Sequence, residues 1–432
     1  MATPLRIGIA GLGNVGASVF RLIKANSDIL SARAGRDIVV TAVSARDKNR
    51  NRGLDLSGVS WHDDARALAA DPNVDVVVEL MGGAEGAAFD LVTGALKAGK
   101  NVVTANKALL ASRGGEVLAY MGTGKGAIAF EAAVAGGIPV IKGLREGLAA
   151  NRIHAIYGIL NGTCNFILST MTETGRDFDD VLAEAQQRGY AEADPSFDVD
   201  GVDAGHKLSI LSGLAFGCVP DVKNIELKGI RGVSALDIAF AAELGYRIKL
   251  LGIARKTARG IEQSVEPCLV PQASPIAAIG GPLNAVYVDG DFVGKVLLMG
   301  AGAGGDATAS AVVADIVDIA RGQALPLMGV ANDKVGALEP ADIRQREGSF
   351  YLRFKVLDVP GVVADISAIL RDDKVSLESV LQRGRDPGQP VQLIMTTHET
   401  READMRHAVD KISALKSVME TPHMMRIEEF KG

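Results

Sequence analysis

The sequence is poor in the features of secreted, membrane-spanning and metal-stapled proteins. Its three cysteines, Cys164, Cys218 and Cys268, are far apart and form no CxxC pair, so they indicate neither a disulfide framework nor a zinc knuckle and favour a reducing, cytoplasmic location. Its most apolar stretches are interrupted by charged residues, proline and glycine, and fall short of the ~20 apolar residues of a membrane span. We therefore expect no transmembrane helix and, in the absence of a cleavage pattern, no signal peptide.

An excess of positive charge is also missing. Lysine and arginine together number 46 against 52 aspartates and glutamates, a net charge of −6. Nucleic acid and anionic membranes are therefore not expected as partners. Hydrophobic residues make up 47% of the chain and charged residues 23%, which is typical of folded globular proteins. At ~150 residues per domain, the 432 residues suggest about three domains.

The first 130 residues alternate between strand-like and helix-like segments. Strands are expected at 5–10, 38–43, 74–80 and 101–104, and helices at 64–70 and 89–98. This alternation predicts an α/β domain with a parallel sheet over residues 1–130. Residues 131–330 combine glycine-rich loops, several helices and strand-like runs at 152–159, 247–254 and 285–289, and we expect a mixed α/β domain there.

The end of the chain predicts a third, smaller domain after a charged, loop-like segment at 328–347. Its expected elements are strand 350–356, helix 362–372, strand 377–383, strand 391–397, helix 400–414 and strand 424–428. This βαββαβ order is the ferredoxin-like split motif. We place the domain at residues 349–432.

A glycine motif follows the first expected strand. Gly11, Gly13 and Gly16 form GxGxxG, with Leu12, Asn14 and Val15 between them, at the start of a helical pattern. In this context the motif indicates a dinucleotide-binding Rossmann domain, since the glycines permit a tight turn, a close pyrophosphate and close helix–strand packing. The alternative is an ordinary glycine-rich turn.

The end of the second strand indicates which nicotinamide cofactor is used, because a carboxylate there binds the ribose of NAD and an arginine accommodates the phosphate of NADP. Arg46 favours NADP, while the adjacent Asp47 leaves NAD open. Lys48 and Arg50, which follow Arg46, add to the preference for NADP; the alternative for these two residues is a solvated basic loop.

Polar residues are densest between residues 185 and 207. Five carboxylates and one lysine fall within the sixteen residues from Glu192 to Lys207. Asp203 and Lys207 are four residues apart in a helical pattern, so their side chains project from one face and can meet one ligand. The alternative is an exposed ion pair worth ~0.3–0.5 kcal/mol. The spacing does not match a divalent-metal loop.

Residues 185–207 resemble the homoserine dehydrogenase signature at every fixed position, and so do segments 103–107, 130–139, 161–165 and 300–312. The last segment has Ala301 and Ala307 where the family usually has proline. The resemblance covers the whole chain and implies reversible NAD(P)-dependent interconversion of L-aspartate 4-semialdehyde and L-homoserine, in a central domain that is both catalytic and dimerising. A homodimer or homotetramer is expected.

The resemblance also implies roles for individual residues. Lys207 matches the proton-donating lysine, Glu192 and Asp203 match substrate carboxylates with Asp198 nearby, and Lys107 matches a lysine between cofactor and substrate. Gly189 and Gly304 match positions beside the nicotinamide. A sodium site of the family maps onto Glu131, Val134, Gly136 and Ile138; the alternative for Glu131 is a buried, hydrogen-bonded side chain.

The third domain resembles an ACT domain in segment 350–366, which implies sensing of an amino acid, with threonine expected. A dimerisation module without a ligand is the alternative. Two other functions stay open from the residues alone. A different NAD(P)-dependent amino-acid dehydrogenase would share the glycine loop but not the 185–207 pattern, and a non-catalytic sensor could dispense with Lys207.

Overall fold

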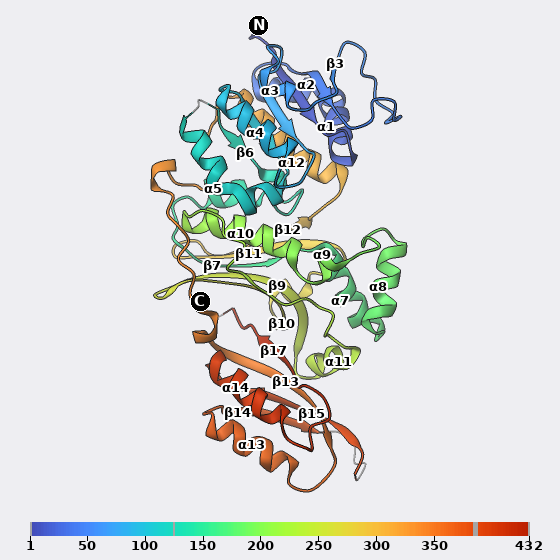
Figure 1. Ribbon diagram of the computed structural model, residues 1–432, viewed down its shortest axis with the longest axis vertical. Coiled ribbons are helices and arrows are strands. Elements are labelled where there is room, and N and C mark those ends of the chain that lie inside the picture. Colours follow the sequence, from blue (N-terminus) through green and yellow to red (C-terminus); the bar gives the residue numbers. More distant parts are fainter. Residues whose placement is uncertain (1, 124–125, 383–387, 431–432) are drawn as a thin grey trace. The chain divides into compact units, whose positions relative to one another are not determined.

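The computed structural model describes residues 2–123, 126–382 and 388–430 (Figure 1). The chain forms two compact units, each assembled from separate stretches of sequence. The first unit comprises Met1–Gly162, Asp203–Ile225 and Leu283–Glu339. The second comprises Thr163–Val202, Glu226–Pro282 and Pro340–Gly432.

The first unit contains a six-stranded parallel sheet in the order β3-β2-β1-β4-β5-β6. Its strands are β1 (Leu5–Ala10), β2 (Ile38–Ser44), β3 (Ser60–His62), β4 (Val76–Glu79), β5 (Asn101–Thr104) and β6 (Ile128–Ala129). The order reverses beside β1, and such a reversal is where open α/β sheets bind ligands. The glycine motif follows β1 and therefore lies at this point.

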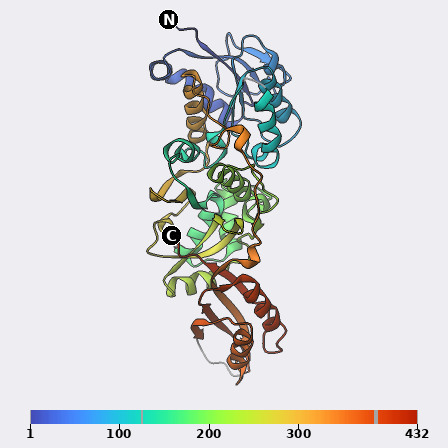
Figure 2. The ribbon, with the colours of Figure 1, turned by 90° about the vertical axis from the view of Figure 1, so that its left-hand side faces the viewer.

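A helix from late in the chain completes the core of this sheet. Helix α12 (Gly305–Ala320) lies beside α1 (Asn14–Ala25), as Figures 1 and 2 both show. The buried residues Val312 and Ile316 of α12 share one apolar cluster with Ile9 of β1 and Val19 of α1. Helix α2 (Ser27–Ala34) contributes Leu30 to the same cluster. Burying this apolar surface stabilises the arrangement at ~25 cal/mol per Å².

The remaining helices of the parallel sheet are α3 (Ala67–Ala70), α4 (Ala87–Lys97) and α5 (Lys107–Thr123). The first unit also holds an antiparallel set of three strands in the order β12-β11-β7. These are β7 (Ile153–Ile159), β11 (Leu283–Gly290) and β12 (Gly294–Ala301). Helix α10 (Val202–Phe216) follows in this unit and is largely buried.

The second unit has a continuous sheet in the order β9-β10-β17-β13-β15-β14. Its strands are β9 (Tyr246–Thr257), β10 (Gly260–Pro271), β13 (Glu347–Leu357), β14 (Leu377–Gln382), β15 (Pro390–Thr397) and β17 (His423–Ile427), with the short strands β8 (Glu226–Leu227) and β16 (Thr400–Arg401) at its margins. The helices of this unit are α7 (Gly162–Thr174), α8 (Phe178–Gln187), α9 (Ser196–Val199), α11 (Ala235–Glu243), α13 (Val362–Asp372) and α14 (Glu402–Ser413).

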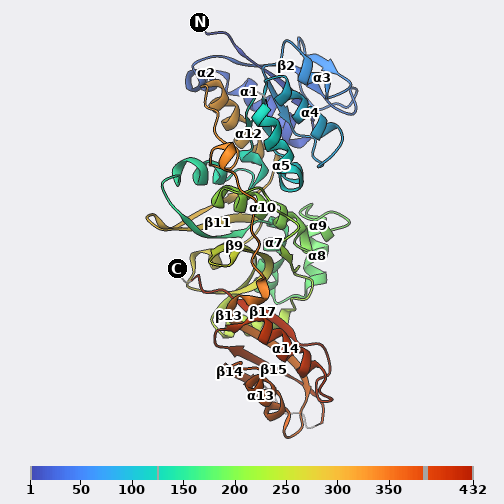
Figure 3. The ribbon, with the colours of Figure 1, turned by 60° about the vertical axis from the view of Figure 1, so that its left-hand side comes forward.

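Helices α13 and α14 lie together on one face of the terminal strands, as Figure 3 shows. Alternate residues of β13, among them Phe350, Leu352 and Phe354, share an apolar cluster with Ile366 of α13 and Met405 of α14. The apolar face of the strand, formed by every second residue, thus packs against the apolar faces of the two helices. The predicted βαββαβ order is confirmed over the described residues, while the expected strand end at Arg383 lies outside them.

Most other expected elements are confirmed within a few residues, and the differences have identifiable causes. The short strands β3 and β6 were not predicted because their two or three residues carry no periodicity. Strands β10 and β12 were also not predicted. Strand β10 is buried on both faces, but its charged residues Glu262 and Glu266 interrupt the apolar pattern that such a strand normally has. In the described part of the chain, no helix is long and apolar enough to cross a membrane.

Candidate active site

The first unit brings Lys107, Asp203 and Lys207 together, and these three residues form the lysine–aspartate cluster. Lys107 begins α5 directly after β5, while Asp203 and Lys207 lie one turn apart on α10. The Nζ of Lys207 is 2.8 Å from Asp203 Oδ2, and the Nζ of Lys107 is 3.0 Å from Asp203 Oδ1. The prediction that Asp203 and Lys207 share one face of a helix is confirmed. One carboxylate thus bridges two ammonium groups.

Burial separates this cluster from an ordinary surface ion pair. Asp203 is 4% exposed and Lys207 8% exposed, whereas the side chain of Lys107 is 34% exposed. Burial opposes ionisation of Asp203, but the ammonium groups of Lys207 and Lys107 outweigh it and hold the pKa of the Asp203 carboxyl well below its usual range. Asp203 is therefore a carboxylate throughout the neutral range, and the more exposed Lys107 forms the open side of the cluster.

The end of β7 holds both members of α10 in place. The backbone carbonyl of Leu160 accepts a hydrogen bond from Lys207 Nζ at 2.7 Å. The side-chain Nδ2 of the next residue, Asn161, donates to Asp203 Oδ2 at 2.9 Å. Asn284, at the start of β11, donates through its Nδ2 to the same Leu160 carbonyl at 2.9 Å. Two asparagines therefore support the cluster from neighbouring strands.

The glycine motif has the geometry that dinucleotide binding requires. Gly11 has φ +99°, and a Cβ at Gly16 would come within 1.9 Å of the Gly11 carbonyl oxygen. A Cβ at Gly13 would instead meet open space. The first glycine therefore makes the turn, the third allows the helix to pack, and the second leaves room for a phosphate.

A cavity of about 360 Å³ lies against this motif. It is lined by Leu12, Gly13, Asn14, Ala17, Ser18, Arg21, Arg50, Asn51, Arg52, Gly305 and Asp306. The first turns of α1 and α12 both border it, because Gly305 approaches the carbonyl of Asn14. Gly304, with φ +115°, precedes α12 at its N-terminus. Two helix N-termini and three arginines make the cavity suited to a pyrophosphate.

Arg52 contacts the glycine motif. Its guanidinium donates to the carbonyls of Leu12 at 3.1 Å and Asp47 at 2.7 Å, which ties the loop after β2 to the loop after β1. Arg50 lines the cavity, while Arg46 is exposed and does not line it. The sequence carries no signal that singles out Arg52 and leaves the role of Arg50 open, because basic loop residues have the same pattern whether they are solvated or line a site.

Glu131 lies in a short 3₁₀ turn, and its carboxylate accepts hydrogen bonds from the backbone N–H groups of Ile141 at 2.9 Å and Lys142 at 2.8 Å. It is 2% exposed, and burial raises its pKa to about 7. Val134 and Gly136 follow on the chain, with left-handed backbone at Gly136 (φ +49°), and the carbonyl of Ile138 accepts from Val140 N–H at 2.7 Å. No group of three or more histidine, cysteine or acidic side chains that could hold a metal occurs among the described residues.

Three of the expected site residues belong to the second unit. Gly189 follows α8 with φ +74°. Glu192 is exposed in the loop after it, and Asp198 is half-buried in α9. All three precede α10 directly in the chain.

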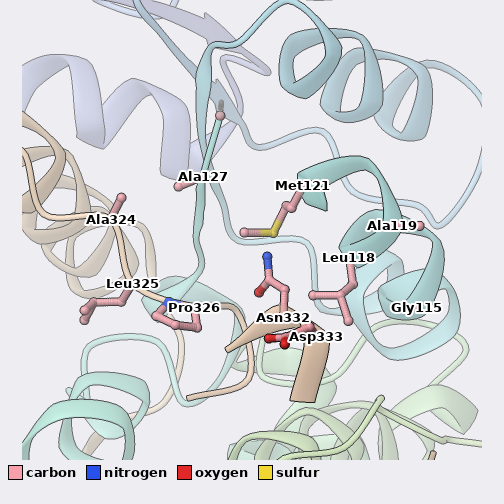
Figure 4. Close-up of a pocket in the computed structure, with 11 residues that line it drawn as sticks. Gly115, Leu118, Ala119, Met121, Ala127, Ala324, Leu325, Pro326, Asn332 and Asp333 are labelled. Carbon is pink, nitrogen blue, oxygen red and sulfur yellow. The ribbon is translucent and has the colours of Figure 1, made fainter. Parts of the chain in front are cut away.

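A larger cavity of the first unit, about 780 Å³, lies away from both the glycine motif and the lysine–aspartate cluster. Figure 4 shows it between Leu118 and Met121 of α5 and the segment from Ala324 to Asp333. Its walls are mostly apolar, and it shares no residue with the lysine–aspartate cluster or the glycine motif. Size alone therefore does not identify the reactive site.

Comparison with known proteins gives matches over nearly the whole chain. The family model described as homoserine dehydrogenase, NAD binding domain, matches residues 11–131. The model described as homoserine dehydrogenase matches residues 139–317, and an ACT domain model matches residues 350–417.

Individual relatives agree with these models. The homoserine dehydrogenase of Neisseria gonorrhoeae is 45% identical, over 98% of this chain and 99% of its own, and that of Pseudomonas aeruginosa is 44% identical, over 99% of each. The crystal structure of a homoserine dehydrogenase from Thiobacillus denitrificans superposes with a TM-score of 0.93 at 43% identity, covering 99% of both chains. A hyperthermophilic archaeal homoserine dehydrogenase in complex with NADPH has a TM-score of 0.62 at 29% identity, covering 73% of this chain and 97% of that one.

Proposed function

The chain belongs to the homoserine dehydrogenase family, and from that premise we propose which of its residues carry out the reaction and its control. It is an NAD(P)-dependent oxidoreductase that interconverts L-aspartate 4-semialdehyde and L-homoserine. Its α/β architecture comprises an N-terminal dinucleotide-binding domain, a central catalytic domain and a C-terminal ACT domain. The boundaries 1–130, 131–330 and 349–432 stay predictions.

Lys207 is the proton donor in this proposal, and the geometry of the lysine–aspartate cluster is the observation that carries it. The reduced nicotinamide, when bound, supplies a hydride to the aldehyde carbon. The carbonyl oxygen then becomes an alkoxide, and one N–H of Lys207 protonates it to give the hydroxyl. Leu160 and Asp203 each hold one N–H of the Lys207 ammonium, which leaves the third for the substrate oxygen. In the direction of oxidation, Lys207 takes that proton back.

Asp203 holds the ammonium group of Lys207 in place, and Lys107 lies on the more exposed side of the cluster, where cofactor and substrate would meet. Glu192, Asp203 and Asp198 are proposed to hold the amino group and hydroxyl of the substrate, because a cationic α-amino group requires carboxylate partners. Gly189 and Gly304 are proposed to lie beside the nicotinamide; neither has a side chain that would restrict its approach.

NADP is the proposed cofactor, with NAD as the alternative. The cavity at the glycine motif fits the dinucleotide, since it combines open space at Gly13, two helix N-termini and arginine side chains. Arg46, at the end of β2, is proposed to contact the 2′-phosphate of NADP, with Arg50 beside it. The archaeal relative in complex with NADPH supports this choice.

A monovalent cation, sodium, is proposed at Glu131 with the backbone carbonyls of Val134, Gly136 and Ile138. The donor set fits, because one buried carboxylate and several carbonyls are hard oxygen ligands. Each carboxylate oxygen already accepts one N–H and retains a lone pair. A bound cation would favour the ionised form of a carboxyl whose pKa burial raises to about 7. The competing role is that Glu131 only caps the start of α6 (Val140–Lys142).

The ACT domain is proposed to bind an amino-acid effector, with threonine as the candidate. In support, the turn from Asp358 to Gly361 leads into the N-terminus of α13, where backbone N–H groups can hold a carboxylate. Assembly as a homodimer or homotetramer and a cytoplasmic location complete the proposal; the latter is supported by the low number and wide spacing of the cysteines in the sequence.

The test of the catalytic proposal is a steady-state assay of the full chain. We expect L-homoserine to reduce NADP and NAD at measurable rates, and L-aspartate 4-semialdehyde to oxidise both reduced cofactors. L-serine, which is one methylene shorter, serves as the control substrate and should be inert. An intact protein that oxidises serine and homoserine equally would contradict the proposed site.

A further inference from the structure

The carbonyl of Leu160 is the meeting point of two hydrogen bonds that are made by residues far apart in the chain. Lys207 Nζ donates to it at 2.7 Å and Asn284 Nδ2 donates to it at 2.9 Å. A carbonyl oxygen has two lone pairs, so the two donors together saturate it. The direction of this carbonyl therefore determines where the Lys207 ammonium lies, and Asn284 shares in fixing that direction.

Asn284 is itself held rigidly. It is 1% exposed and lies on β11 opposite Gly300 of β12. The backbone of Gly302 packs directly against its amide, because a Cβ at Gly302 would come within 2.0 Å of Asn284 Cγ. Only a glycine at 302 leaves room for the asparagine, and this glycine lies in the loop that leads to Gly304 and α12.

The oxygen of the Asn284 side-chain amide, unlike its nitrogen, makes no hydrogen bond to the described residues. This oxygen, Oδ1, is buried. Rotating the amide by half a turn would bring this oxygen against the Leu160 carbonyl, so the donor assignment of Nδ2 follows from that contact. A buried unpaired acceptor costs folding free energy. Stability alone would favour an apolar residue here, which points to a role for the Nδ2 donor in the reaction.

We propose that Asn284 is a positioning residue for proton transfer: it orients the Leu160 carbonyl, and through that carbonyl it places the Nζ of Lys207 against the substrate oxygen. The inference rests on the proposed role of Lys207. Without the Asn284 donor, the peptide at Leu160 can tilt and the ammonium tilts with it. A displacement of about 1 Å at a reacting group can lower a rate by roughly 100-fold.

The test uses two variants of the full chain, Asn284→Ala and the nearly isosteric Asn284→Asp. We expect kcat to fall by roughly 10- to 100-fold in both, while the KM for the nicotinamide cofactor stays within a factor of two or so. The solvent deuterium isotope effect on kcat should increase, since proton transfer becomes slower than the other steps. In Asn284→Asp the pH profile of kcat should also move to higher pH, because a new carboxylate stabilises the protonated form of Lys207.

The matched control is Asn151→Asp. Asn151 also donates through Nδ2 to a backbone carbonyl, that of Leu148, and lies beside the other end of β11. We expect kcat and its pH profile to be unchanged in this variant. If Asn284→Asp folds and retains the wild-type kcat, pH profile and isotope effect, the inference is overturned.

A double variant separates this inference from the proposed role of Lys207. In a Lys207→Met background, adding Asn284→Ala should not lower kcat further, because the group that Asn284 positions is gone. If Lys207→Met is slow and Asn284→Ala lowers its kcat by the same factor as in the wild type, the inference fails and the role of Lys207 stands. If Lys207→Met turns over at the wild-type rate, both fail.

Discussion

Asp203 determines the charge state of the site. With Asp203 ionised between two ammonium groups, the cluster as a whole has a net charge of about +1, which suits a step in which an alkoxide develops. Without it, two ammonium groups would face each other with no carboxylate between them, and their repulsion would disfavour the arrangement.

Replacing Lys207 with methionine, which keeps most of its apolar volume, should lower kcat by roughly 10²–10⁴-fold, because the donor of the proton is lost. Cofactor binding, measured by fluorescence titration with NADPH, should persist. The control is Lys223→Met, since Lys223 is an exposed lysine of the same unit. Near-wild-type turnover in Lys207→Met would contradict the mechanism.

Cofactor preference should depend on the loop after β2. Arg46→Ala is expected to raise the KM for NADPH by roughly 10-fold or more and to affect NADH little, because only NADPH has a 2′-phosphate for the guanidinium. Arg50→Ala tests the residue that lines the cavity. If Arg46→Ala weakens both cofactors equally, Arg46 contacts the part that they share.

The buried side chain of Lys249 in β9 should make the stability of the protein depend on pH. It is 5% exposed, donates to the carbonyl of Ile279, and burial lowers its pKa from 10.5 to about 8. Between these two values the unfolded chain binds more protons than the folded one, so raising the pH favours folding. We expect the urea midpoint to gain a positive contribution from pH 8 to about 10, and Lys249→Met to lack it. Identical slopes in both proteins would refute this assignment.

Strand β10 and the elements of the ACT domain are joined by buried ion pairs. Arg346, which precedes β13 and is 3% exposed, forms ion pairs with Glu266 of β10 and Glu402 of α14, and donates to Ser264 Oγ at 3.0 Å. Burial opposes ionisation of Glu266, but Arg346, Lys228 and Arg426 together outweigh it and lower the pKa of Glu266 to about 2. Strand β17 also pairs in parallel with β10 through Cys268 and Leu269. Strands β10, β17 and β13 therefore belong to one continuous sheet.

Arg346→Met should destabilise the second unit by about 3–5 kcal/mol, because the buried carboxylates of Glu266 and Glu402 both lose their buried arginine partner. Chemical denaturation followed by circular dichroism measures the loss. Arg344→Met is the matched control: its side chain is 68% exposed in an ion pair with Asp342, and such a pair contributes about 0–1 kcal/mol. Equal effects of the two substitutions would show that burial does not govern the Arg346 pairs.

The ACT domain is not a separate compact unit of this chain. The compact unit that contains β13–β17 also contains residues 163–202 and 226–282. Removing residues 340–432 would expose the edge of β10 and leave Glu266 without Arg346. Regulation is therefore best measured on the intact protein.

L-threonine is expected to inhibit the intact enzyme through the ACT domain. A coupling free energy of about 1–3 kcal/mol between effector and substrate sites would be ordinary, and it corresponds to a change in apparent affinity of roughly 5- to 150-fold. Initial rates at increasing L-threonine, with D-threonine as the control, measure it. If calorimetry and kinetics show no response to L-threonine, the domain binds another ligand or is structural.

Local patterns in the sequence determined the elements and part of the site. The strand–glycine–helix context of Gly11, Gly13 and Gly16 and the four-residue spacing of Asp203 and Lys207 depend only on neighbouring residues, so periodicity was enough to predict both. The signature at 185–207 identified the family for the same reason. Arg46, by contrast, was chosen by position alone, and the loop that carries it folds so that Arg50 and Arg52 line the cavity.

Only the tertiary structure decided what joins these elements. The contact of Lys107 with Asp203, the support of Leu160 by Asn284, and the packing of α12 on the parallel sheet bring together residues that are distant in the chain. Such contacts depend on strand order, register and chain reversal, which no local period encodes. The sequence also does not show which charged side chains are buried. Arg344 and Arg346 have the same side chain, yet in the fold Arg344 is exposed and Arg346 lies between two carboxylates.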